Sequence, residues 1–116
     1  MLTTELVIGS NTYKLRLNIE NTIALQKKIG KNPIEIFSNL NGAQMPDITD
    51  MACVLFYALQ PCHNDEFKEI ADVYALIDNY YDEGGDITSL IKVILEIYKV
   101  SGTIPKSSNI KNIMKK

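Results

Sequence analysis

The chain has 116 residues, of which 46% are hydrophobic and 22% are charged, as expected for one globular domain with a modest core. No apolar run is long enough to span a bilayer, and the first ten residues lack the basic end and apolar core of a signal peptide, so we expect a cytoplasmic protein without a membrane partner. Cys53 and Cys62 are too few for a disulfide framework, and we interpret them as buried free thiols.

Charge is unevenly distributed along the chain. Residues 1–102 hold all 14 acidic residues and eight of the 12 basic residues, a net charge of −6, whereas residues 103–116 hold four lysines and no acid. An acidic body repels a phosphate backbone, so we do not expect the body to bind nucleic acid. We therefore predict one domain over residues 1–102 and a basic, mobile tail over residues 103–116.

Residues 6–17 predict a β-hairpin. Gly9, Ser10 and Asn11 have turn chemistry, and the residues that follow alternate between apolar and polar, as in a strand with one buried face. No later segment supplies a third strand, so we expect both edges of the hairpin to be open to a partner. Val7 is a candidate interface residue for this reason.

A sharp corner between two helices follows the hairpin. Asn18 can cap a helix over residues 19–29, and Gly30 suits the left-handed position that ends one. Asn32 and Pro33 then form a new N-cap and first helical position, which predicts a second helix over residues 33–40. On the first helix we expect an apolar face of Ile19, Ile23, Leu25 and Ile29, with Gln26 buried in it and bonded to the hairpin backbone.

Three longer helices complete the expected fold. A third begins near Asp47 or Thr49, is apolar nearly all round and ends at Pro61, which predicts a buried central helix. A fourth covers residues 67–82, and Gly84 and Gly85 break the chain before a fifth, capped by Asp86, covers residues 87–101. The fold class is therefore α+β and mostly α, with an N-terminal hairpin and about five helices.

The fifth helix has more apolar residues than one core face requires. Ile91, Leu95 and Val100 lie off its main stripe, so they are candidate interface residues. We expect the tyrosines at helical spacing to serve mainly as packing residues, and we keep Tyr81 as a further interface candidate because tyrosine buries a large area while retaining a polar tip.

No chemical motif indicates catalysis or metal binding. Cys53, Cys62 and His63 lack a fourth zinc ligand at a workable spacing. A calcium loop read from Asp82 places Ile87 at its sixth position, where a glycine is needed. The chain has one histidine and neither a glycine-rich phosphate loop nor a nucleophile with a recognisable base, so we expect no enzyme, cofactor or metal.

The order of these pieces resembles the tail assembly chaperones of long-tailed phages and prophages of Gram-positive bacteria. The resemblance covers about residues 5–102. It depends on the hairpin LVIGSNTYKLRL, the corner KKIGKNPIEIF and the segment DVYALIDNYYDEGGDITSLIKVILEIYKVSG, with Gly30, Asn32, Pro33, Gly84 and Gly85 as its most specific residues. Late in the first helix, where members of this family are expected to have an acidic residue, this chain has Gln26.

The resemblance implies a partner and a role. Such chaperones coat the long tape measure protein, keep it soluble, help to recruit tail tube subunits and are absent from the mature virion. In many of these phages a ribosomal frameshift makes a longer form that is thought to contact the tube protein. The expected partners are thus the tape measure protein, the tail tube protein and other copies of this chain.

Two other roles remain open at this point. A head–tail connector subunit would share the size and helical content but would stay in the particle. A nucleic-acid-binding regulator would use the lysines of the tail, and truncation after Gly102 would abolish its binding.

Overall fold

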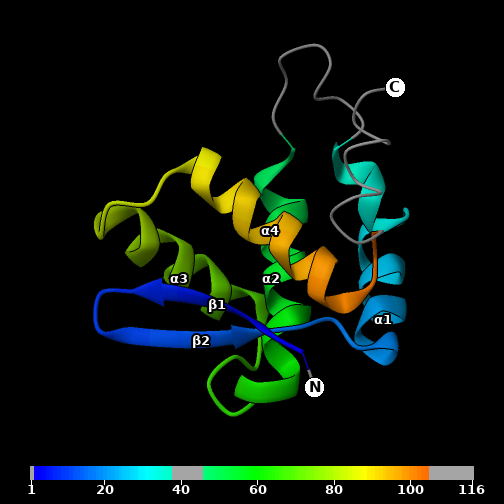
Figure 1. Cartoon of the computed structure of the whole chain (residues 1–116), viewed down its shortest axis with the longest axis horizontal. Coiled ribbons are helices and arrows are strands. Elements are labelled where there is room, and N and C mark those ends of the chain that lie inside the picture. Colours follow the sequence, from blue (N-terminus) through cyan, green and yellow to red (C-terminus); the bar gives the residue numbers. More distant parts are fainter. Residues whose placement is uncertain (1, 38–45, 105–116) are drawn as a thin grey trace.

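The computed structural model describes residues 2–37 and 46–104. Two strands come first, followed by four α-helices and one 3-10 helix, as Figure 1 shows: β1 (Thr4–Ile8), β2 (Asn11–Leu15), α1 (Ile19–Ile29), η1 (Pro33–Phe37), α2 (Ile48–His63), α3 (Ile70–Asp82) and α4 (Ile87–Ser101). The mostly α fold with an N-terminal hairpin is confirmed. The second helical segment is a 3-10 helix over its described residues, where an α-helix was expected. The predicted basic tail lies outside the described residues from position 105 onward.

The hairpin closes through a two-residue turn at Gly9 and Ser10. Ile8 pairs with Asn11 next to the turn, and the antiparallel register runs to Thr4 opposite Leu15. Gly9 has a φ of 59°, a left-handed conformation that glycine adopts without strain. The alternation in the sequence places one face of the hairpin in the core, where the following side chains are buried: Leu6, Ile8, Leu15 and Leu17.

Helix α2 is the centre of the molecule. It packs against β2, α1, α3 and α4, and Figure 1 shows it behind the hairpin and between the other helices. Six of its residues are buried, which confirms the central apolar helix expected from the sequence: Met51, Ala52, Val54, Leu55, Ala58 and Leu59.

The prediction that Pro61 ends this helix is wrong, because α2 continues to His63. Proline removes one backbone donor, but contacts with the hairpin hold the last turn in place. The N–H of Arg16 donates to the Ala58 carbonyl at 3.0 Å, and the N–H of Lys14 donates to Nε2 of His63 at 2.9 Å. Tertiary hydrogen bonds thus outweigh the local preference of proline.

Helix α1 has the predicted ends but a narrower buried face. Asn18 caps it by accepting from the N–H of Asn21, and Gly30 ends it with a φ of 74°. Leu25 is its only buried residue, whereas Ile19 is 75% exposed and Ile23 is 47% exposed. The expected broad apolar face is therefore wrong for these two isoleucines, because α1 packs mainly on α2 and η1 and no described element covers its outer side. Gln26 is half-buried, and its side chain makes no hydrogen bond to the hairpin within residues 2–37 and 46–104.

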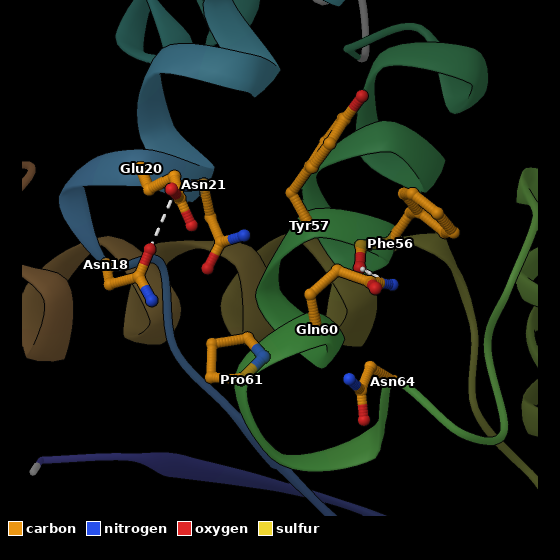
Figure 2. Close-up of a pocket in the computed structure, with 8 residues that line it drawn as sticks. All are labelled: Asn18, Glu20, Asn21, Phe56, Tyr57, Gln60, Pro61 and Asn64. Carbon is orange, nitrogen blue, oxygen red and sulfur yellow. Dashed lines mark hydrogen bonds between the residues drawn. The ribbon is translucent and has the colours of Figure 1, made fainter.

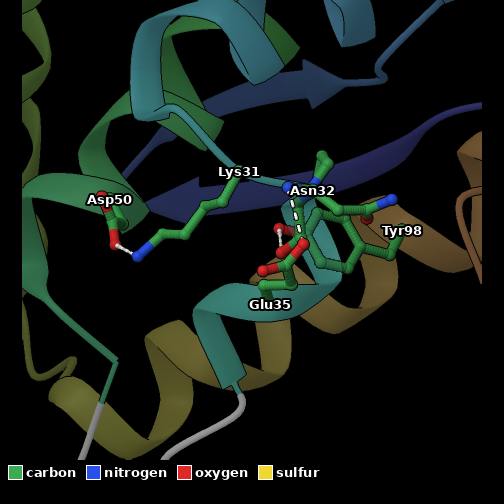
Figure 3. Close-up of polar contacts among 6 residues, drawn as sticks. Lys31, Asn32, Glu35, Asp50 and Tyr98 are labelled. Atoms are coloured by element: carbon green, nitrogen blue, oxygen red, sulfur yellow. Dashed lines mark hydrogen bonds and ion pairs between the residues drawn. The ribbon is translucent and has the colours of Figure 1, made fainter.

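The corner after α1 is fixed by polar contacts from two distant helices, as Figure 3 shows. The N-cap role of Asn32 is confirmed, because its side chain accepts from the N–H of Ile34, and its own N–H donates to Glu35. The hydroxyl of the fully buried Tyr98 on α4 donates to the Pro33 carbonyl at 2.8 Å. Lys31 and Asp50 of α2 form an ion pair at 2.8 Å, which raises the pKa of Lys31.

The last two helices meet at the predicted glycine break. Helix α3 begins at Ile70, three residues later than expected, because Glu69 and Asp72 form a capping box while Phe67 is buried in the preceding turn. Gly85 lies against the ring of Tyr80, where an added Cβ would be 2.5 Å from ring carbons. Asp86 caps α4 by accepting from the N–H of Ser89, which lowers the pKa of Asp86.

Candidate functional site

The thiols and the imidazole of this chain do not form a reactive cluster. No group of three or more His, Cys, Asp or Glu side chains that could hold a metal occurs in the described part of the chain. Nε2 of His63 accepts from the Lys14 N–H, and its Nδ1 lies 3.4 Å from a Glu66 carboxylate oxygen. The expectation of two buried thiols is wrong: Cys53 is half-buried, and Cys62 is exposed on the last turn of α2. Over residues 2–37 and 46–104, no helix has the length and hydropathy required to cross a bilayer.

One edge of the hairpin is closed by the body of the protein. With Ile8 and Asn11 as the pair next to the turn, the N–H groups of Thr12, Lys14 and Arg16 point away from β1. Those of Lys14 and Arg16 are bonded to α2, through the His63 ring and the Ala58 carbonyl. The expectation that both edges are open is therefore wrong for β2, because α2 lies alongside it.

The other edge of the hairpin remains unpaired in the described part of the chain. The same register directs the backbone groups of Glu5 and Val7 away from β2, and they make no hydrogen bond to any described residue. The Val7 side chain is 57% exposed. An unpaired strand edge is a template for β-pairing with another chain, and β1 has no proline or lysine to block it.

Exposed apolar side chains also occur on the outer helices. Tyr74 is 49% exposed and Tyr81 37% exposed on α3, while Ile19 and Ile23 are exposed on α1. The sequence singled out Tyr81 but missed the other three, because each fits an apolar helical stripe equally well. The apolar residues of α1 are spread over a wide arc of the helix. A small domain rarely covers such a wide arc, so this spread was a signal that some of them would be exposed.

The three candidate interface residues of α4 are neither fully buried nor fully exposed. Ile91, Leu95 and Val100 are half-buried, and Ile91 packs against the core cluster. The carbonyl of Val100 accepts from the guanidinium of Arg16 at 3.0 Å, which ties the end of α4 to the hairpin.

An open pocket of about 380 Å³ lies between the start of α1 and the second half of α2 (Figure 2). Amide and aromatic groups dominate its lining, which consists of Asn18, Glu20, Asn21, Phe56, Tyr57, Gln60, Pro61 and Asn64. Oδ1 of Asn21 is buried without a hydrogen-bond partner among the described residues, and Nε2 of Gln60 donates to the carbonyls of Phe56 and Phe67. This lining offers hydrogen bonds and ring faces, and its single carboxylate, Glu20, has no second acid or base beside it.

Comparison with known proteins gives no relative for this chain. No protein-family model matches it, and neither does any curated protein or solved structure.

Proposed function

We propose that this protein is a tail assembly chaperone of a long-tailed phage or prophage, which binds the tape measure protein, keeps it soluble and helps to recruit tail tube subunits. The observation that carries the proposal is a small acidic body with an unpaired strand edge and apolar side chains on several faces. These are the properties of a protein that binds other proteins. The resemblance in element order narrows that general class to this family.

The physical requirements of such a chaperone agree with these surfaces. A protein that keeps a long client soluble needs apolar area to offer the client and net charge to keep the complex in solution. Val7, Tyr74 and Ile19 supply apolar area on three different elements, and residues 1–102 carry a net charge of −6.

We place client contacts at the open edge of β1 and on the outer side of α4. Val7→Pro would remove an edge donor, and Leu95→Lys would place a charge on the half-buried side of α4. The expected result is weaker client binding by folded variants. Variants that keep their circular dichroism and thermal unfolding profile and still bind the client as well as the unchanged chain would refute this placement.

The proposal is tested by co-expression with the large, tape-measure-like protein encoded in the same gene cluster. A client that is insoluble alone should become soluble and co-purify with this chain. As a control, the same client is co-expressed with an unrelated acidic protein of similar size, which should leave it insoluble. Unchanged solubility and the absence of a complex would contradict the proposed function.

The proposal also predicts where the protein acts. A chaperone of this kind works in the bacterial cytoplasm and is left behind when the particle is complete. Mass spectrometry of purified virions should therefore not detect it, although the infected or induced cell contains it. Its recovery in virions at a fixed copy number would favour a structural role in the particle.

A further inference from the structure

The pocket between α1 and α2 carries a negative charge without a counter-charge in its lining. Glu20 is exposed and forms no ion pair with any residue of the described ranges. None of the eight lining residues is a lysine, an arginine or a histidine. Figure 2 shows Glu20 and Asn21 of α1 on one side of the pocket and the α2 residues on the other. A cationic ligand would therefore meet a carboxylate here without competition from another cation of the lining.

Pro61 leaves a backbone acceptor on the same face of α2. A regular helix bonds each carbonyl to the N–H of the residue four positions later. Because proline has no N–H, the carbonyl of Tyr57 cannot receive this bond from Pro61, although α2 continues through both residues to His63. Tyr57 and Pro61 both line the pocket, so the carbonyl that points from one toward the other lies on this face of the helix.

Two amide side chains add further acceptors. Nε2 of Gln60 donates to the carbonyls of Phe56 and Phe67 at 3.1 and 2.9 Å, which fixes the amide and leaves its Oε1 without a donor among the described residues. Oδ1 of Asn21 is buried and has no partner in that part of the chain either. Polar groups shielded from water are normally hydrogen-bonded, so these oxygens favour a ligand that donates.

Aromatic rings complete the lining. The rings of Phe56 and Tyr57 lie edge to face, with their centroids 5.1 Å apart and their planes at 82°. Both side chains are half-buried, which leaves part of each accessible. The face of an aromatic ring attracts a cation, and the attraction is strongest where the cation has lost its water. The aliphatic stem of a long basic side chain also packs well against such rings.

We propose that this pocket binds the side chain of a lysine. An ammonium group has three donors that diverge from one nitrogen, which suits acceptors contributed by two different helices. A guanidinium group is planar and pairs side by side with a single carboxylate, so the spread of acceptors favours lysine over arginine. The pocket, at about 380 Å³, has room for the side chain and the backbone that carries it. This inference does not rest on the proposed function, because it follows from the chemistry of the pocket alone.

The lysine can belong to another protein or to this chain. The N–H of Leu17 donates to Oγ of Ser101 at 2.8 Å, so α4 ends next to the residue that precedes Asn18 of the pocket lining. The segment that follows α4 has four lysines, which lie outside the described residues: Lys106, Lys111, Lys115 and Lys116. Both sources offer the same ammonium group, and the experiment distinguishes them.

A lysine derivative tests the pocket in the full-length chain. Nα-acetyl-lysine methylamide, whose side-chain ammonium is free, is added to isotope-labelled protein and followed by nuclear magnetic resonance. The amide signals of Asn21, Gln60 and Asn64 should shift, with a dissociation constant on the order of 1 mM for so small a ligand. The norleucine derivative has the same stem without the ammonium and should bind at least about tenfold more weakly.

Matched variants locate the binding. Glu20→Gln should weaken binding of the lysine derivative by about tenfold, because it removes the carboxylate charge. Glu5→Gln makes the same chemical change at an exposed position on β1 and should leave binding unchanged. Tyr57→Leu should weaken binding by about fivefold through the lost ring face, whereas Tyr74→Leu on α3 should have no effect. Circular dichroism of each variant verifies that it is folded.

A further full-length variant identifies the source of the lysine, in which Lys106→Gln, Lys111→Gln, Lys115→Gln and Lys116→Gln are combined. Binding of the derivative to the unchanged chain supports a pocket that is open to a lysine of another protein. Binding that occurs only in this variant supports a pocket that is filled by the chain's own lysine.

Three results would overturn the inference. The first is the absence of binding both to the unchanged chain and to the variant without these lysines. The second is a norleucine derivative that binds as well as the lysine derivative, since the ammonium would then contribute nothing. The third is a folded Glu20→Gln variant that binds as tightly as the unchanged chain.

Discussion

Tyr98 connects two segments that are far apart in the sequence. It lies on α4, is fully buried, and donates its hydroxyl hydrogen to the carbonyl of Pro33, 65 residues earlier. Its ring also contacts Phe37 edge-on, with the ring centroids 5.9 Å apart. Burial, followed by the nearby charge of Asp50, raises the pKa of this phenol well above its usual range.

The first prediction concerns the stability of the fold at high pH. Because the unfolded chain releases the phenolic proton near pH 10 and the folded chain retains it, stability should fall as pH rises above about 10. Tyr98→Phe should cost about 1 kcal/mol at neutral pH through the lost hydrogen bond and should flatten this alkaline decline. Urea unfolding at about pH 8 and about pH 11 measures both effects.

Lys31, whose pKa is also raised, contributes a loss of stability in the same direction in both proteins, so the difference between the unchanged chain and Tyr98→Phe isolates Tyr98. Equal alkaline declines would count against the assignment.

The second prediction separates the two thiols. Cys62 is exposed, whereas Cys53 is half-buried and burial raises the pKa of its thiol, which leaves less of the reactive thiolate at neutral pH. A thiol reagent should therefore label Cys62 first and Cys53 at least tenfold more slowly in the folded protein. Mass spectrometry of partly labelled protein, with a urea-unfolded sample as the control, gives the two rates. Similar rates in the folded protein would contradict the partial burial of Cys53.

At the scale of elements, the two edges of the hairpin differ. The backbone of β2 is bonded to α2 at Lys14 and Arg16, while the outward groups of Glu5 and Val7 on β1 have no partner among the described residues. Proline removes a backbone donor, so its effect depends on whether that donor is used.

The third prediction follows from this difference. Lys14→Pro should destabilise the domain by more than about 1 kcal/mol, because it removes the bond to His63, whereas Val7→Pro should cost less. Chemical denaturation of the two variants gives the comparison. Val7→Ala and Lys14→Ala serve as side-chain controls. A larger cost at Val7 would show that the outward register assigned to β1 is wrong.

The fourth prediction concerns the loop between α3 and α4. An added Cβ at Gly85 meets the Tyr80 ring at 2.5 Å, and the hydroxyl of that ring donates to Ser89 Oγ at 2.6 Å, so the ring cannot move freely. Gly85→Ala should cost about 1–3 kcal/mol of stability. In a Tyr80→Ala background the same change should cost clearly less, and thermal unfolding of the four proteins completes the cycle. Equal costs in both backgrounds would place the clash elsewhere.

For the whole molecule, α2 is the element on which the others depend. Among the described elements, it is the one helix that packs against the hairpin, α1, α3 and α4 together. Its buried residues from Met51 to Leu59 should therefore open only when the domain unfolds globally.

The fifth prediction follows from this arrangement. Amide hydrogens in the middle of α2 should exchange most slowly in the described part of the chain, and those of Glu5 and Val7 on β1 should exchange faster than those of Lys14 on β2 and Arg16 just after it. Hydrogen exchange followed by mass spectrometry or nuclear magnetic resonance measures this order. Fast exchange throughout α2 would contradict its central role.

The elements and their ends were largely determined by the sequence. Asn18, Gly30 and Asp86 are local signals, since a side chain or a left-handed backbone acts within a few residues, and the structure confirms all three. The interface candidates were only partly accessible to sequence reasoning. Tyr81 was chosen as an interface candidate and is exposed, whereas Ile19, Ile23 and Tyr74, which are also exposed, have the same periodic pattern as buried residues.

Tertiary packing decided what periodicity leaves open. Helix α2 passes Pro61 because hydrogen bonds from Lys14 and Arg16 hold its last turn, and the same contacts close one hairpin edge and leave the other open. Helices α1 and α3 both pack against α2, so the position of α2 decides which side of each of them faces outward. The described elements pack around α2 and leave Ile19 and Ile23 on α1 and Tyr74 and Tyr81 on α3 exposed, because a small domain has more apolar surface than it can bury.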